Sequence, residues 1–178
     1  MSFVADTTSP LQEQAETRLL EFTRSRLFAR TFRDGMDLVE ETAAYLDGPG
    51  RADAKRLGTD EALIYATESM RLTTRLMQVA SWLLTQKALR EEEMSVQEAR
   101  ADKYRLREER ETEGGLSFAE IARTAHALPA TLLDLIARSD SLHSQILRLD
   151  RSLYGSIAMQ QGNSVADQLS RLKTAFNA

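Results

Sequence analysis

The residue types that most often perform chemistry are sparse in this chain and poorly spaced for it. The two histidines, His126 and His143, lie in neither an HExxH nor a Glu-x-x-His pattern, and the chain has no cysteine. Asp140 and His143 share a helix face at spacing i, i+3, but two ligands alone do not make a metal site. No Gly-x-Ser-x-Gly motif and no phosphate-binding glycine loop occurs. We therefore expect no catalytic, metal-binding or cofactor-binding residues.

Three charged residues lie within the most apolar part of the chain, at a spacing that puts them along one side of a helix: Glu68, Arg71 and Arg75. One interpretation is a solvent-facing row whose charge contacts contribute about 0.2–0.5 kcal/mol each. The other is a strip that faces a partner or orders a helix crossing. We take the three as candidate partner-binding residues, and we expect the only tryptophan, Trp82, in the core.

A second candidate site spans residues 118–136, where a short helix, a break and a following helix could form a helix-turn-helix. The second helix would need donors for bases and phosphates, yet it carries Asp134 and no arginine before Arg138. His126 also stands where the turn usually has glycine. A small helix-turn-helix transcriptional regulator is therefore the alternative function, and duplex binding that depends on Arg123 or Arg138 would favour it.

Helices must position these residues, because apolar residues recur at helical spacing and no strand-type alternation competes with them. The longest helix is expected from Asp60 to about Glu93, roughly 45 Å long, with Thr59 as its cap. It carries two apolar stripes and should therefore contact two neighbours. The first stripe contains Leu63, Ala66, Met70, Met77, Ala80 and Leu84, and the second contains Leu72, Leu76, Val79 and Leu83.

Other helices are expected on both sides of this one in the sequence. Ser25 opens a helix with a continuous apolar stripe to about Asp47, and Gly48-Pro49-Gly50 ends it with a reversal. Ser95 and Glu98 have the spacing of a capping box, which predicts a further helix. The remaining expected helical segments are 96–109, 117–127, 129–153 and 164–176.

The chain is expected to form one domain, with a flexible arm over 1–20, a helical bundle over 21–154 and a mobile tail over 155–178. The arm should become helical somewhere between Leu11 and Arg26. Residues 100–113 are mostly charged and should project into solvent. The tail carries an isolated amphipathic face, which is the second candidate partner-binding surface and comprises Val165, Leu169, Leu172 and Phe176. The fold class is an all-α, antiparallel three-helix bundle with additional short helices and flexible termini.

Composition excludes several classes of function. The net charge of -4 and the pI near 5.3 provide no global positive field for nucleic acid or an anionic membrane. The N-terminus has no basic segment followed by an apolar one, and the strongest apolar run is too short to cross a bilayer. A cytoplasmic protein is expected.

The run from Tyr65 to Leu84, YATESMRLTTRLMQVASWLL, strongly resembles the signature of the bacterial RcdA family, named for regulation of CtrA degradation. Two further stretches agree with that family, namely FARTF at 28–32 and the segment 38–51 that ends in YLDGPGR. Together with residues 118–153, the likeness covers most of the expected bundle. It fades in the N-terminal arm, and the tail beyond Tyr154 matches no pattern of the family.

The resemblance implies a dimeric three-helix-bundle adaptor of alphaproteobacteria, without catalytic residues or a cofactor. Such adaptors help the AAA+ protease ClpXP receive cell-cycle regulators such as CtrA-type response regulators. The implied partners are a second copy of the chain, ClpXP with a CpdR-like priming factor, and substrate proteins or a PopA-like adaptor that binds cyclic di-GMP. Neither nucleic acid nor membrane is implied. The implied location is the cytoplasm, with recruitment to a cell pole alongside the protease.

Overall fold

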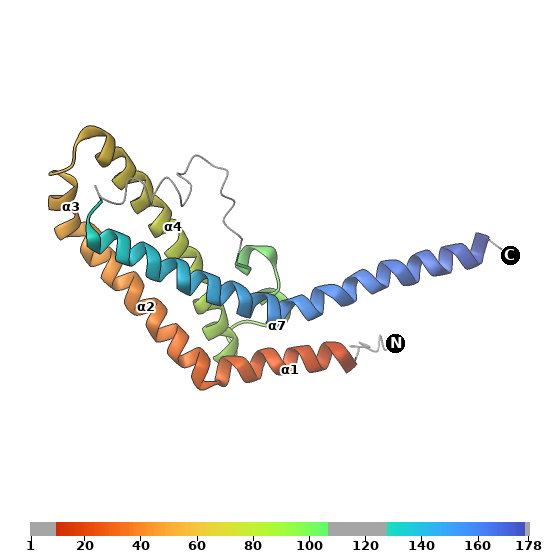
Figure 1. Ribbon diagram of the computed structural model, residues 1–178. Coiled ribbons are helices and arrows are strands. Elements are labelled where there is room, and N and C mark those ends of the chain that lie inside the picture. Colours follow the sequence, from red (N-terminus) through yellow and green to blue (C-terminus); the bar gives the residue numbers. More distant parts are fainter. Residues whose placement is uncertain (1–9, 107–127, 177–178) are drawn as a thin grey trace.

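The computed structural model describes residues 10–106 and 128–176, with side chains described over 13–106 and 128–155. The elements are α1 (Pro10–Arg24), α2 (Arg26–Asp47), α3 (Pro49–Ala54), α4 (Thr59–Arg90), α5 (Val96–Ala99), the 3-10 helix η1 (Asp102–Tyr104) and α7 (Ala130–Phe176). These two ranges contain no strand, and the expected all-α fold class is confirmed. Helices α2, α4 and α7 pack side by side, and α1 lies across the end of the bundle where α7 extends beyond it (Figure 1).

Local capping explains where the bundle helices begin and end. Ser25 caps α2, because its Oγ accepts a hydrogen bond from the amide of Phe28 at 3.1 Å. Pro49 then starts α3 in the first helical position, which needs no amide donor. Thr59 is not the cap of α4 as expected. Gly58 occupies that position without a side-chain hydrogen bond, since glycine is also accepted there, and Thr59 is the first helical residue.

The core lies between the inner face of α4 and its two long neighbours. The second apolar stripe expected on this helix is buried, as is Trp82 at 1 % exposure, so both expectations are confirmed: Leu72, Leu76, Val79 and Leu83. The large side chains of the first stripe are exposed. Leu63, Met70, Met77 and Leu84 are 49–71 % exposed, while α4 contacts two long neighbours, α2 and α7, as expected.

The packed region extends further toward the N-terminus than expected. Residues 10–20, placed in a flexible arm from the sequence, belong to α1, where Ala15 and Leu19 are buried against Leu89 and Tyr154. The arm lacks a long apolar stripe, but two buried residues one helical turn apart are enough to dock it. The bundle therefore gains a fourth packed helix.

The charged stretch after α4 begins as part of the body. Ser95 and Glu98 form the expected capping box, but α5 ends at Ala99 and does not continue to residue 109. Arg100 turns to Glu16 in α1 at 3.1 Å, and Leu106 is buried. These tertiary contacts replace the charge pairs of a longer helix. Residues 107–113 of the expected projection lie outside the described residues.

The last helix is longer than its glycines suggest. α7 continues through Gly155 and Gly162 to Phe176, where the sequence favoured a break after Leu153. A single glycine costs a helix only about 1 kcal/mol, which the flanking residues can offset. The tail face at Val165, Leu169, Leu172 and Phe176 falls where side chains are not described. The helix expected at 117–127 lies outside the described residues.

No helix among the described residues combines the length and the apolar character that crossing a bilayer requires.

Candidate functional site

The strip of Glu68, Arg71 and Arg75 lies at the crossing of α4 with α7. Glu68 is 3 % exposed, and its carboxylate accepts from Arg71 Nη1 at 3.3 Å. Arg75 reaches across to α7, where its Nη1 donates to Ser139 Oγ at 3.1 Å. Glu68 and Arg71 therefore pair within α4, and Arg75 links this helix to α7. Contact with a second protein stays a prediction for them.

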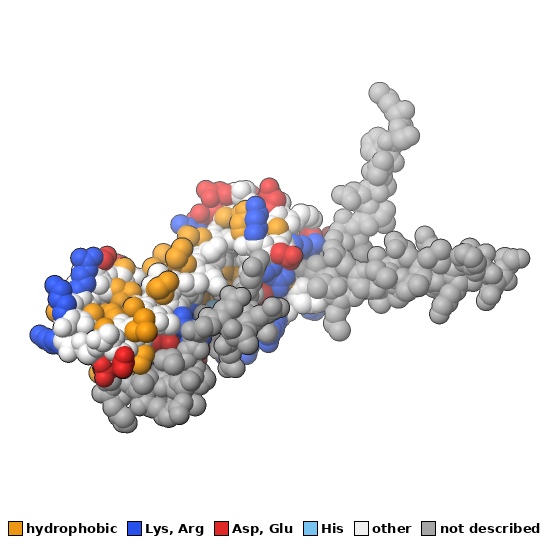
Figure 2. Space-filling model, turned by 90° about the horizontal axis from the view of Figure 1, so that it is seen from above, with side chains coloured by type: hydrophobic (Ala, Val, Ile, Leu, Met, Phe, Trp, Pro, Cys, Tyr) orange, Lys and Arg blue, Asp and Glu red, His pale blue; other side chains and the backbone are white. Residues whose placement is uncertain are grey.

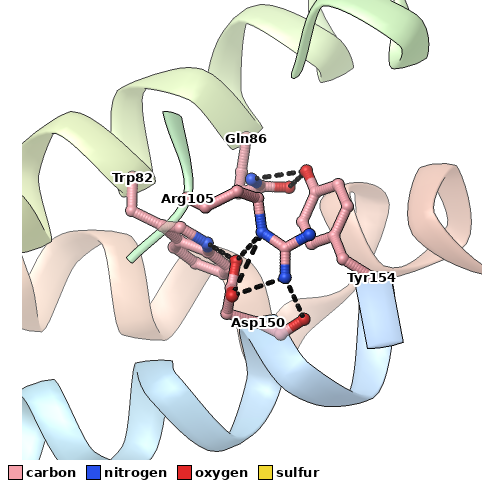
Figure 3. Close-up of polar contacts among 5 residues, drawn as sticks. All are labelled: Trp82, Gln86, Arg105, Asp150 and Tyr154. Atoms are coloured by element: carbon pink, nitrogen blue, oxygen red, sulfur yellow. Dashed lines mark hydrogen bonds and ion pairs between the residues drawn. The ribbon is translucent and has the colours of Figure 1, made fainter. Parts of the chain in front are cut away.

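A second polar cluster, which the sequence did not reveal, joins α4, α7 and the residue that follows η1 (Figure 3). Asp150 in α7 accepts from Trp82 Nε1 at 2.9 Å and from Arg105, whose Nε and Nη2 donate at 2.9 and 2.7 Å. The guanidinium of Arg105 also stacks over the ring of Tyr154, 4.1 Å from its centroid. Tyr154 and Gln86 share a buried hydrogen bond of 3.0 Å. We call these five residues the clasp.

The clasp is arranged to hold the fold. The indole and the guanidinium are both directed at the Asp150 carboxylate, and such short charge-assisted hydrogen bonds are stronger than neutral ones. The Gln86 amide is directed at the Tyr154 hydroxyl. Burial raises the pKa of Tyr154, so its hydroxyl stays neutral and keeps its hydrogen bond with Gln86. This geometry pins the start of the charged segment to two long helices.

The described residues that were considered for metal or DNA binding form neither kind of site. Asp140 is exposed and His143 is buried, and no group of three or more potential ligands gathers within the part of the chain that the structure describes. Arg138 donates to Glu41 in α2 at 2.7 Å and to Asp134 at 3.2 Å, and its hydrogen bonds hold the pKa of Glu41 below its usual range. Two carboxylates beside this guanidinium disfavour a phosphate. Arg123 lies outside the described residues.

Among the residues whose side chains the structure describes, four of the five exposed large hydrophobic residues lie on the outer face of α4. Between Ala62 and Thr85, none of the exposed residues of this helix is charged: Leu63, Ala66, Met70, Thr73, Thr74, Met77, Ser81 and Leu84. Figure 2 looks down on this side and shows hydrophobic side chains gathered between charged ends. The hydroxyls of Thr73 and Thr74 donate to carbonyls of their own helix at 2.8 and 2.9 Å, so they need no outside acceptor.

The four large residues on this face are spaced by seven: Leu63, Met70, Met77 and Leu84. A period of seven keeps a stripe aligned with a second helix along its length. The stripe is visible in the sequence, but its spacing does not show that these four side chains are exposed in the fold. Patches of this kind mark protein interaction sites.

The geometry therefore defines an all-helical bundle, held by internal polar contacts, that presents an uncharged apolar helix face. The chain belongs to the family described as "Protein of unknown function (DUF1465)", whose model matches residues 19–176. It is similar to RcdA from Caulobacter crescentus CB15, known from a crystal structure, at 53 % sequence identity and a TM-score of 0.59. That match covers 74 % of this chain and 94 % of RcdA, which confirms the resemblance to the RcdA family. No curated protein matches the chain.

Proposed function

We propose that this chain is a non-enzymatic, cytoplasmic adaptor that helps deliver cell-cycle regulatory proteins, such as CtrA-type response regulators, to the ClpXP protease. The observation that carries the proposal is the 53 % identity with RcdA over 74 % of the chain. The bundle supports it, because its buried ion pair of Arg105 and Asp150 serves the fold while an apolar helix face stays exposed.

The mechanism is tethering. One surface docks on the protease primed by a CpdR-like factor, and another holds the substrate directly or through a PopA-like adaptor. Linking two partners in this way raises their effective concentration to the millimolar range, about 10²–10⁴-fold in avidity, without new chemistry. The tail face, comprising Val165, Leu169, Leu172 and Phe176, is proposed as one of these surfaces, because an amphipathic helix can lie in a partner's groove.

Reconstituted degradation tests the adaptor function. A CtrA-type regulator is incubated with ClpXP and the priming factor, with and without this protein, and its rate of loss is measured. We expect the rate to depend on the full chain and to fall for at least one substrate when residues 164–178 are deleted. Degradation that is the same with and without this protein would contradict the adaptor. Degradation of every substrate that is unchanged by deleting residues 164–178 would contradict the role of the tail face. Salt-sensitive duplex binding that depends on Arg123 or Arg138 would instead support a transcriptional regulator.

The adaptor is proposed to act as a homodimer formed through the outer face of α4. A two-fold axis near Thr73 and Thr74 would bring Leu63 of one copy toward Leu84 of the other, and Met70 toward Met77. Because the spacing is symmetric about that point, the face is complementary to itself, as an isologous contact requires. The small residues between the large ones allow the two helices to approach closely.

Introducing charge on this face should separate the copies. We expect Met70→Glu with Met77→Glu to weaken self-association by about a hundredfold or more, because two carboxylates per copy would enter an apolar contact. Light scattering after gel filtration measures the mass, and circular dichroism checks that the helices persist. Ala137→Glu, at an exposed site on α7, is the matched control. A monomeric parent chain, or a dimer that survives both substitutions, would refute this interface.

A further inference from the structure

A hollow with a positive rim lies between α2 and α4, on the side of α4 that faces α2. Its apolar part is formed by the half-buried side chains of Phe32 and Met36, with the core residue Phe28 beneath them. Phe28 and Phe32 pack with their ring centroids 5.9 Å apart. The same hollow is lined by three basic side chains and one acidic one: Arg33, Lys87, Arg90 and Asp37.

The basic side chains are weakly neutralised. Lys87 and Arg90 both approach one carboxylate, that of Glu91, at 3.8 and 4.0 Å, and long exposed pairs of this kind contribute little. Arg33 has no ion-pair partner among residues 13–106 and 128–155. Arg26 lies seven residues before Arg33 and therefore extends the basic character along the same side of α2. The hollow is thus locally positive on a chain whose net charge is -4.

The apolar floor and the basic rim are within reach of one ligand. The Nζ of Lys87 is 5.9 Å from the centroid of the Phe32 ring. A side chain resting on that ring would therefore hold its neighbouring residues beside the cation. A phosphate backbone is recognised by charge and hydrogen bonding and would leave the apolar floor of the hollow unused. The combination favours a short peptide that alternates acidic and apolar side chains.

We propose that this hollow docks an acidic segment of a partner protein, with an apolar side chain on Phe32 and Met36 and carboxylates against Arg33, Lys87 and Arg90. The inference rests on the proposed adaptor function and adds a docking surface that is separate from the tail face and from the dimer face of α4. Attraction between opposite charges would speed the encounter, and the apolar contact would select among acidic segments.

Binding of a defined peptide to the full chain tests the proposal. The probe is a fluorescein-labelled peptide of about twelve residues, with a Leu-Phe pair flanked by glutamates, a length that suits a groove of this kind. Fluorescence anisotropy is expected to show binding that weakens with added salt. Arg33→Glu and Ala29→Glu, both at exposed lining positions, should each reduce affinity by about tenfold, whereas Arg148→Glu on α7 should leave it unchanged.

Two changes to the probe separate the roles of charge and apolar contact. Replacing the Leu-Phe pair by serines, or the glutamates by lysines, should each abolish most of the binding. The proposal is overturned if the parent chain does not bind the peptide, if both variants bind it as tightly as the parent, or if the serine peptide or duplex DNA binds equally well. Degradation is measured separately, so a protein that delivers substrates without binding the peptide disproves only the hollow, and the reverse result disproves only the adaptor.

Discussion

Replacing Asp150 by alanine is expected to lower the free energy of unfolding by about 3 kcal/mol. This value is at the lower end of the range of about 3–5 kcal/mol for removing one partner of a buried ion pair. The substitution removes the acceptor of both Trp82 and Arg105 and leaves a cation and an indole N–H without their partner. The side chain of Arg105 is 25 % exposed, so water recovers part of that loss. Urea denaturation followed by circular dichroism measures the change. Protein concentration is held fixed, because self-association would add to apparent stability.

A double-mutant cycle distinguishes the clasp from a simple loss of a side chain. Asp150→Leu combined with Arg105→Met removes both charges, so the pair should cost less than the sum of the single changes by about 1–3 kcal/mol. Asp140→Ala serves as a control, because that carboxylate on the same helix is 66 % exposed and 3.9 Å from Arg75. Additive effects at residues 105 and 150 would show that the two side chains are not coupled.

The clasp also shows what the sequence could not predict. Arg105 stands in a run of alternating charges, where solvent exposure is the usual outcome, and its partner lies 45 positions away in another helix. Pairing across that distance depends on how α4 and α7 are placed, which no local spacing encodes. The capping box of Ser95 and Glu98 was predictable because both partners lie within one helical turn.

Periodicity predicted the bounds of the long helices better than it predicted how these helices pack together. The apolar stripes placed α2 and α4 within a few residues of their observed bounds, since helical spacing is set by local geometry. The same spacing could not show which stripe of α4 is exposed, because burial depends on the other elements. The candidate surfaces on the outer face and in the hollow therefore become visible only when the helices are assembled.

Gly35 is the position at which a small side chain should matter most. A Cβ atom there would lie 2.5 Å from Leu83 Cδ1 in α4 and 3.6 Å from Leu142 Cδ2 in α7, because α2 approaches both helices closely at this buried glycine. Gly35→Val is expected to lower the free energy of unfolding by about 2–3 kcal/mol, since overpacking outweighs the modest gain in helix propensity. Gly35→Ala should be close to neutral, because the end of a leucine can turn away from one methyl group. Urea denaturation compares the two.

Shortening Leu83 tests whether its contact with residue 35 causes the destabilisation by Gly35→Val. Leu83→Ala alone should destabilise the bundle by about 2–4 kcal/mol, as loss of a buried leucine does. In the Gly35→Val background the same change should cost at least about 1 kcal/mol less, because the valine occupies part of the space that the leucine leaves. Ala44→Val, at an exposed site on α2, isolates the propensity effect and should cost below about 1 kcal/mol. If Leu83→Ala costs the same in both backgrounds, the glycine is not required by the approach of α2 to α4. Coupling would instead place a close contact of α2 with α4 at Gly35, so the glycine that weakens α2 as an isolated helix would set how closely α2 packs in the fold.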